Sequence, residues 1–441
     1  MVKCQRVRGF LWVAGVAAVC CSWAQAGDKP GDKFPTYDTP YYTIHSDIDK
    51  EKLREIEATL TPLAEEYNRR IKEFSPAKAT KKLPFYLFAK NEDYLGAGGP
   101  AGSSGVFKPD SVPRSGPVDG RMLVSWDMTS TVVPKEHVIQ HECFHQFLCS
   151  MVAYRLMLLP WINEGLAEYY GYAAWTGDGY VAGILPPVTL AELQREIKAK
   201  EMLPVTKSVP MDFAQWTKAC KDTQNHTYVQ CWGTVYFLVH ADGGKYQKLM
   251  NDFIKDVAGG KPQEAAFAAR FGPGGGPLGK RYEEWWLAQT ADSTADLQTR
   301  ATVATMTSFL ARAHASGMKF KDYDDFLQQA DQDKLLNKTS QWLPKELLAK
   351  AVDEAKKLEG WSLAATSGRP PKLLLKTSDG TVFTGTFQST GKRVTKVDVT
   401  VTKARTPTSG KSDPAKAGPN AADQLQHIKD RINGYHPGVG D

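Results

Sequence analysis

The first part of the chain combines short β-type apolar runs with a longer segment that has a helical period. A two-residue alternation predicts a strand at 41–47, compact apolar runs predict strands at 83–90 and 121–128, and the helical period predicts a helix over 48–74. The intervening segment 96–120 is rich in Gly, Ser and Pro, which favours a loop. The expected order is therefore strand, helix, strand, loop, strand.

From Pro134 onward the apolar residues recur with a helical period. One long helix is predicted over 136–156 and a second over 160–175. A third helix, over 227–240, is almost wholly apolar and is therefore expected to be buried. The pattern predicts three further helices, at 244–257, 262–271 and 280–289.

The last third of the chain changes character twice. Residues 291–360 keep a helical pattern but are more polar, whereas 361–405 has a two-residue period with a hairpin turn at Asp379-Gly380. Residues 406–441 have the Ser, Gly, Pro and Lys content of a flexible tail. We therefore expect an α+β fold in which a domain at 27–290 is followed by a helical extension and a small β-module.

Residues 1–26 have the composition of a secretory signal, with basic residues, an apolar run and Ala-Gln-Ala at the end. The apolar run, Phe10–Trp23, is shorter than the roughly 20 residues that span a bilayer. An uncut anchor, or a lipid on one of the cysteines in this run, is the alternative. We expect a mature chain that begins at Gly27, has no transmembrane segment, and resides in the periplasm, the cell envelope or the extracellular space.

The net charge bears on the possible partners of the protein, and the cysteines bear on its possible disulfides. The signal carries three positive charges and no acid, so the net charge falls from +6 to +3, which is too small to indicate a nucleic-acid partner. Cys143 and Cys149 should share one helix and point about 120° apart, so they cannot bridge each other. A disulfide between Cys220 and Cys231 and a set of four buried free thiols are both compatible with the sequence.

The segment from His141 to Leu148 reads HECFHQFL. On a helix, residues four apart lie on the same face, so His141 and His145 can bind one metal ion together. Glu142 is rotated by about 100° from His141, and so it lines the site without being a ligand. That is the position of a general base for a metal-activated water. A match of five residues also occurs by chance on solvated helix faces.

A catalytic zinc site needs a third protein ligand. Glu164, in the segment PWINEGLAEYY, follows His145 with eighteen residues between them, enough for one helix to end and a second to pack against it. Glu168 faces the same way and can accept a hydrogen bond from a ligand imidazole. Two acids on an otherwise apolar and aromatic helix are costly unless they have partners, and a metal with two histidines would supply them.

Together these motifs resemble those of the gluzincins, the zinc metallopeptidases with HExxH and a distant Glu. The chain is more closely similar to secreted bacterial proteins with an uncharacterised peptidase-MA-like domain. The resemblance covers about residues 40–290 and implies a zincin-like fold: a small mixed sheet, active-site helices and a helical C-terminal lobe. The zinc ligands that it implies are His141, His145 and Glu164. It implies that Glu142 is the base and that Glu168 is the acid that orients a ligand imidazole.

Many gluzincins also use a Tyr or His that polarises the oxyanion. Tyr228, at the start of the apolar third helix, matches this role best, with His226 as the competitor and simple packing of the tyrosine as the alternative. We expect His137 to lie near solvent at a helix end, although it could contact substrate or metal. The chain lacks the G-x-M-E-N segment with which aminopeptidases bind the free amine of the substrate.

The expected function is therefore zinc-dependent hydrolysis of peptide bonds by an exported protein, with endopeptidase favoured over aminopeptidase activity. The strand at 121–128 is expected to pair, as an edge strand, with an extended peptide or protein substrate. The alternative is a catalytically silent zinc-binding or envelope-associated binding protein. In that case the C-terminal β-module and tail would carry the main role.

Overall fold

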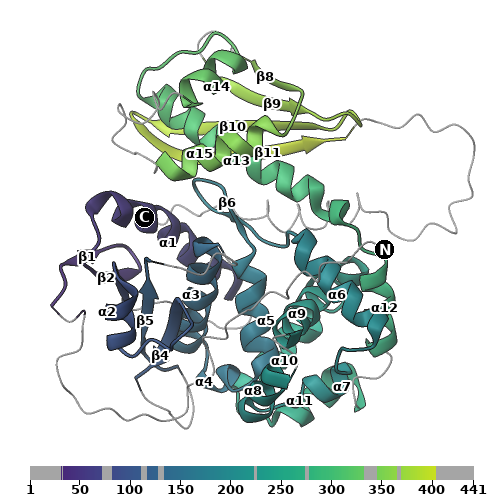
Figure 1. Cartoon of the computed structure of the whole chain (residues 1–441). Coiled ribbons are helices and arrows are strands. Elements are labelled where there is room, and N and C mark those ends of the chain that lie inside the picture. The colour runs from purple at the N-terminus through teal and green to yellow at the C-terminus, as the bar shows by residue number, and fades with distance from the viewer. Residues whose placement is uncertain are drawn as a thin grey trace, which may run out of the picture.

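The computed structural model describes residues 31, 33–71, 82–110, 117–127, 134–222, 226–273, 278–331, 345–364 and 369–403. The predicted signal and tail, 1–26 and 406–441, lie outside the described residues. Helices and strands are mixed along the chain, which confirms the α+β class. Figure 1 shows two parts, a lower one with a five-stranded sheet and most of the helices, and an upper one with a four-stranded sheet.

The five-stranded sheet has the strand order β1-β2-β3-β5-β4. Its strands are β1 (Thr36–Asp38), β2 (Tyr42–Ser46), β3 (Leu83–Phe88), β4 (Gly105–Pro109) and β5 (Gly120–Ser125). The three inner strands are parallel to one another, and β1 and β4 are antiparallel to their neighbours. Helix α1 (Lys50–Ile71) follows β2 and makes the crossover that a parallel pair requires.

The edge strand is not the one that the sequence indicates. β5, the strand predicted at 121–128, is paired on both sides, by β3 and β4, so it is interior. The edge strands are β1 and β4, and β4 lies inside the segment predicted as a loop, after the short helix α2 (Asn91–Gly96). β4 was missed because its five residues, GVFKP, are too few to show a period and include Gly and Pro.

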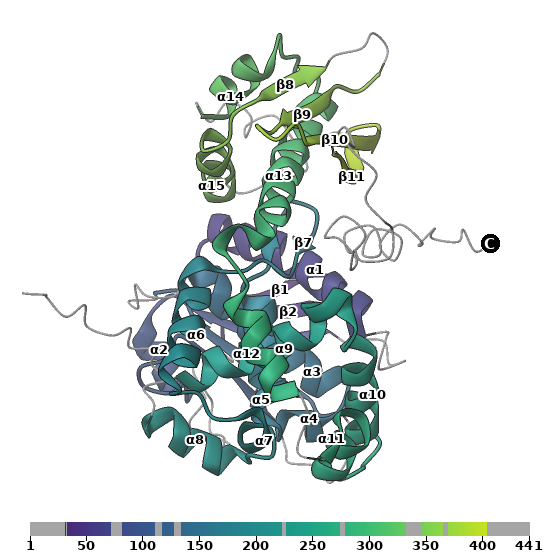
Figure 2. The ribbon, with the colours of Figure 1, turned by 90° about the vertical axis from the view of Figure 1, so that its right-hand side faces the viewer.

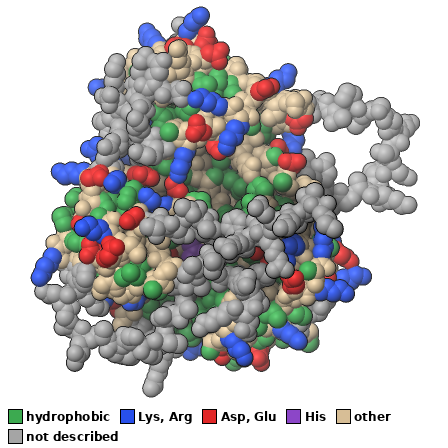
Figure 3. Space-filling view, in the orientation of Figure 1, with side chains coloured by type: hydrophobic (Ala, Val, Ile, Leu, Met, Phe, Trp, Pro, Cys, Tyr) green, Lys and Arg blue, Asp and Glu red, His purple; other side chains and the backbone are tan. Residues whose placement is uncertain are grey.

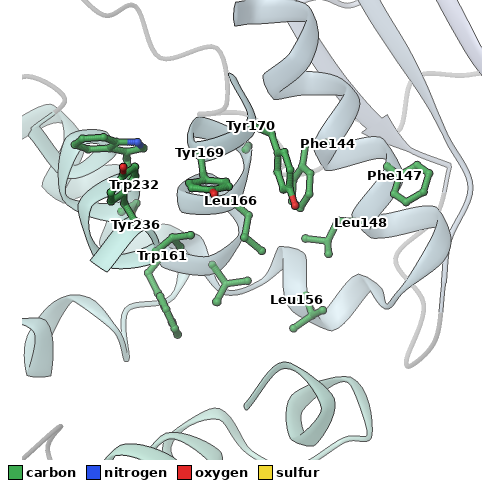
Figure 4. Packing of buried hydrophobic residues seen from close by; sticks show 14 of the residues in the cluster. Phe144, Phe147, Leu148, Leu156, Trp161, Leu166, Tyr169, Tyr170, Trp232 and Tyr236 are labelled. Carbon is green, nitrogen blue, oxygen red and sulfur yellow. The ribbon is translucent and has the colours of Figure 1, made fainter. Parts of the chain in front are cut away.

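Helix α3 (Lys135–Met151) packs on β4 and β5 and is almost wholly buried. It ends at Met151, earlier than predicted, because Ala153 has an extended backbone that separates it from the short helix α4 (Tyr154–Met157). Helix α5 (Pro160–Gly171) packs against α3. Figure 4 shows this contact, in which the Phe144 and Tyr170 rings stack with centroids 4.9 Å apart.

On its other side, α5 packs against α9 (His226–Gly244). The two helices come closest at Gly165, where a Cβ would lie 2.5 Å from the backbone oxygen of Cys231. Tyr169 of α5 faces Trp232 and Tyr236 of α9 across the same contact (Figure 4). The glycine of the NEGLA segment therefore serves packing, and it brings α9 beside the acids of α5.

The lower part contains six further helices among the described residues, most of which contact α9. They are α6 (Pro187–Ala199), α7 (Val205–Ser208), α8 (Phe213–Asp222), α10 (Gln247–Ala258), α11 (Gln263–Phe271) and α12 (Leu278–Leu287). The last three confirm predicted helices, whereas α6 to α8 were not predicted. The end of the second predicted helix is instead a hairpin of β6 (Ala174–Trp175) and β7 (Tyr180–Val181). None of the described helices is long and apolar enough to cross a membrane.

The upper part joins the predicted helical extension and the predicted β-module. Its helices are η2 (Ala291–Thr294), α13 (Ala295–Ala315), α14 (Tyr323–Asp331) and α15 (Lys345–Lys356). Its strands are β8 (Trp361–Ala364), β9 (Lys372–Lys376), β10 (Val382–Thr390) and β11 (Arg393–Thr402), all antiparallel. The predicted Asp379-Gly380 turn connects β9 to β10, with Gly380 at φ 81°.

The predicted helical extension and the predicted β-module share one hydrophobic core. Both the helices and the sheet contribute to it, for example through Leu310, Phe326 and Phe387. The sheet needs the helices because its apolar face must be buried against another layer. Figure 2 shows α13 running from the lower part up to the sheet. The domain boundary predicted at about residue 360 therefore falls inside a single structural unit.

The β6–β7 hairpin connects this unit to the lower part. Arg312 of α13 forms an ion pair with Asp178 in the hairpin, with Nη2 2.7 Å from Oδ1. Trp175 of the hairpin donates a hydrogen bond from Nε1 to the backbone oxygen of Ala58 in α1, at 3.2 Å. Because the hairpin follows α5 directly in the chain, the C-terminal unit contacts the segment that continues from this helix.

Glu196, a buried acid away from these contacts, should make the free energy of unfolding depend on pH. Burial, together with the charge of Glu192, raises the pKa of Glu196 in α6 to about 8. The folded state therefore keeps a proton that the unfolded chain releases near its ordinary pKa of about 4.3. The stabilisation is complete below that value, falls as the pH rises through the interval up to about 8, and is absent above it.

We expect Glu196→Gln to raise the free energy of unfolding at pH 9 by about 1–4 kcal/mol and to change it little at pH 5. Urea unfolding of both proteins at the two pH values measures this difference. The exposed Glu264, changed to Gln, is the matched control and should show no such dependence. An equal difference at both pH values would contradict the prediction.

Candidate metal centre

The structure brings together the side chains that the two motifs supply. Helix α3 contributes His141, Glu142 and His145, and helix α5 contributes Glu164 and Glu168. All five are buried, with at most 7% of any residue exposed. Figure 3 shows a small histidine surface near the middle of one face of the molecule, below the C-terminal unit. Two short helices that pack along their lengths thus place all five groups within one interior region.

Three of these groups form a compact set of potential ligands. His141 Nε2 lies 3.0 Å from His145 Nε2. Glu164 Oε2 lies 3.4 Å from the first of these nitrogens and 3.5 Å from the second. A tetrahedral zinc ion with bonds of about 2.0–2.1 Å separates its ligand atoms by about 3.3 Å. The three distances are close to this value, so the three buried groups could hold one metal ion.

The outer nitrogens of both imidazoles face acceptors. His145 Nδ1 lies 2.9 Å from Asn163 Oδ1, and the Asn163 amide nitrogen donates to Glu164 Oε1 at 3.2 Å. This second contact fixes the amide orientation, so His145 Nδ1 must be the donor. His141 Nδ1 lies 3.1 Å from Glu168 Oε1, where only a donor is favourable. In neutral rings, both Nε2 atoms then carry lone pairs.

Two nitrogen lone pairs and a carboxylate oxygen thus converge inside the protein. Glu164 Oε2 is buried and accepts no hydrogen bond within the described residues. Such an arrangement is costly without a cation between the groups. The donor set, two imidazoles and one carboxylate, is of the kind that zinc accepts. The geometry and the chemistry of the site therefore both fit a bound metal ion.

The charges around the three ligands favour positive charge at this point. Burial alone would raise the pKa of Glu164, but His145 and His141 outweigh it and lower that pKa to about 2. Burial would likewise lower the pKa of His141, but Glu164 and Glu168 hold it well above its ordinary value. The carboxylates thus remain ionised, and the site favours a proton or a metal ion between them.

Glu142 points from the same helix toward the edge strand. The Phe107 backbone N–H of β4 donates to Glu142 Oε2 at 3.0 Å. Glu142 belongs to neither of the two groups of described residues whose donor atoms lie close enough together to share a metal ion, which are His141, His145 and Glu164, and His137, His141 and Glu168. Glu142 is therefore held by β4 and lies outside both groups.

Tyr228 lies on the first turn of α9, close to His141, one of the three potential metal ligands. Its ring centroid is 6.4 Å from that of His141 and 4.8 Å from that of Trp216. Burial and the charge of Glu164 raise the pKa of Tyr228 well above its ordinary value, so its hydroxyl keeps its proton. His226, the alternative residue, begins α9, but its side chain lies outside the described residues.

Two residues differ from what the sequence predicts. His137 is buried, with 4% exposed, rather than near solvent, because α5 and Tyr172 cover the first turns of α3. Its Nε2 lies 3.3 Å from Glu168 Oε2. Asn163, for which the sequence predicts no role, contacts both His145 and Glu164 and orients them. Its position next to Glu164 in the third-ligand segment was the only signal in the sequence.

The four cysteines outside the predicted signal are free and buried, so the Cys220–Cys231 disulfide is absent from the structure. Cys220 Sγ instead contacts Thr227 Oγ1 at 2.6 Å.

No family model, curated protein or solved structure matches the chain. The geometry of the metal centre and the motifs that form it are therefore the features that indicate a function.

Proposed function

We propose that the protein is an exported zinc-dependent peptidase that cleaves internal peptide bonds. The observation that carries the proposal is the convergence of His141, His145 and Glu164, with Glu142 beside them and outside the ligand set. A structural zinc site is closed by four protein ligands, whereas a catalytic site has three and keeps one position open. The mixed sheet under α3, with α5 against it, also fits the zincin-like fold implied by the resemblance.

His141, His145 and Glu164 would hold the ion, and Glu168 and Asn163 would orient the two imidazoles. When bound, zinc supplies Lewis acidity, which lowers the pKa of water and polarises a carbonyl group. The task left to the protein is to position the peptide, move protons and stabilise the developing oxyanion.

Glu142 would act as the general base. It would accept a proton from the attacking water and pass that proton to the nitrogen of the departing amine, so that the proton count balances. The Phe107 amide holds the Glu142 carboxylate at 3.0 Å, which restricts its orientation before substrate binds. A base whose position is already fixed loses little entropy on reaching the transition state.

The strand that holds Glu142 also offers a docking site for the substrate. Among the described strands, β4 pairs only with β5, so the backbone groups on its other edge that Glu142 does not occupy can pair with an extended peptide. The docking strand would therefore be Gly105–Pro109 rather than the strand predicted at 121–128. A peptide on this edge would lie next to Glu142, because β4 and α3 are in contact there.

Tyr228, whose ring lies 6.4 Å from that of His141, would stabilise the oxyanion. Because its hydroxyl stays protonated, it is a hydrogen-bond donor over the whole working pH range. We expect Tyr228→Phe to lower kcat by about 10²–10³-fold with a much smaller change in KM, since the loss of one oxyanion donor has this effect. Steady-state kinetics on a cleaved peptide measure both constants. A change in KM alone would assign Tyr228 to packing.

The distinction between endopeptidase and aminopeptidase can be tested with one pair of substrates. Mature protein loaded with zinc is first incubated with a mixed peptide library, and the best substrate is then prepared with a free and with an acetylated N-terminus. We expect both forms to be cleaved at the same internal bond, because the chain lacks the amine-binding segment. Cleavage of the free form alone would make the protein an aminopeptidase. Full zinc binding without any cleavage would support the silent binding protein instead.

A further inference from the structure

The metal centre continues beyond the three candidate ligands. Glu168 lies between two imidazoles: its Oε1 is 3.1 Å from His141 Nδ1, and its Oε2 is 3.3 Å from His137 Nε2. His137 precedes His141 by one helical turn on α3. Glu164, His141, Glu168 and His137 therefore form a continuous row of charged and polar groups in the interior.

The His137 ring is held in place by close packing. A Cβ at Gly171, the last residue of α5, would lie 2.7 Å from His137 Cε1, so the ring occupies the space that a side chain would need. The Tyr172 ring covers it, with centroids 4.5 Å apart. A ring confined in this way can fix the position of the group it contacts.

Glu168 needs such a contact. The terminal torsion of a glutamate is broad, so one contact to one oxygen does not fix the plane of the carboxylate. The contact of Oε1 with His141 leaves this rotation free, and the contact of Oε2 with His137 stops it. The acid that orients a ligand imidazole affects metal affinity through that imidazole. A group that fixes the acid must therefore act on the metal as well.

We propose that His137 is a positioning residue of the metal centre, which holds Glu168 so that His141 presents Nε2 to the metal ion. The inference rests on the proposed function only in requiring a bound metal, and it does not require peptide hydrolysis. Its test therefore measures metal affinity rather than activity.

His137→Phe keeps an aromatic ring against Gly171 and Tyr172 but removes both ring nitrogens. We expect the Kd for Zn²⁺, measured on the mature protein by competition with a chelator, to rise by about tenfold, at the lower end of the range for outer contacts of a metal site. His137→Gln retains an N–H donor and should recover most of the affinity. His240→Phe is the matched control, because the nitrogen it removes contacts Tyr169 rather than Glu168.

A double-mutant cycle tests whether His137 acts through Glu168. In a Glu168→Ala background there is no carboxylate to hold, so His137→Phe should cause no further loss of affinity. A further tenfold loss in that background, or an unchanged Kd in the single variant, would overturn the proposal. Two zinc ions per chain would also overturn it, since His137 would then be a ligand.

Circular dichroism and thermal unfolding show whether each variant folds. If His137→Phe does not fold, His137→Leu removes the same contact with a smaller side chain and takes its place in the cycle. Wild-type protein that binds one zinc ion but cleaves no peptide would contradict the peptidase proposal alone. The His137 experiment would then proceed unchanged, because its readout is the Kd for the metal.

Discussion

His145→Ala is expected to remove most of the bound zinc from the protein. His145 supplies one of three ligand atoms, and its Nε2 lies 3.0 Å from that of His141 and 3.5 Å from Glu164 Oε2. Residues that only support a ligand cost about 10–100-fold in affinity when changed, so the loss of a ligand itself should exceed about 100-fold. All zinc-dependent hydrolysis should disappear with the metal.

Metal content after dialysis, and chelator competition on the same samples, measure this loss. His240→Ala is the control, because it changes a histidine of α9 that contacts Tyr169 and not the metal centre. It should retain one zinc ion per chain. Full occupancy in His145→Ala would show that the ion is bound elsewhere, and the assignment of His141 and Glu164 would fail with it.

Glu142→Gln should also abolish hydrolysis, but with zinc retained. The amide has nearly the same shape as the carboxylate and can still accept the Phe107 N–H bond, but it cannot take up a proton from water. Removal of a general base costs about 10²–10⁴-fold in rate. We therefore expect kcat/KM to fall by at least about 10²-fold while the Kd for Zn²⁺ changes little.

The matched control is Glu136→Gln, an identical change on the same helix at a residue that pairs with Lys350 of α15. It should leave both hydrolysis and metal content near their wild-type values. Unchanged hydrolysis in Glu142→Gln would exclude Glu142 as the base. Loss of zinc in that variant would instead place its carboxylate among the ligands, contrary to the structure.

The sequence predicted the parts of the metal centre that depend on one helix at a time. His141 and His145 face the same way because they are four residues apart on α3, and the same rule applies to Glu164 and Glu168 on α5. The α+β class and most of the long helices also followed from periodicity. The agreement between α10 to α12 and the predicted ranges has the same origin, since each buries one apolar face.

The sequence did not predict which strand lies at the edge of the sheet. Strand order depends on hydrogen bonds between segments far apart in the chain, and a five-residue strand such as β4 shows no period of its own. The same limit applies to the C-terminal unit. The sequence pattern predicts a boundary between its helices and its sheet at about residue 360, because local patterns do not show that Leu310 and Phe387 share a core.

The residues and their spacing by themselves determined which groups can bind a metal, since helical periodicity is a local property. Only the tertiary structure decided that Glu164 approaches the two histidines to within 3.5 Å, because that distance depends on how α5 packs between α3 and α9. The packing also buried His137 against Gly171 and turned it toward Glu168. Contacts of this kind arise between elements, so no pattern within one element can specify them.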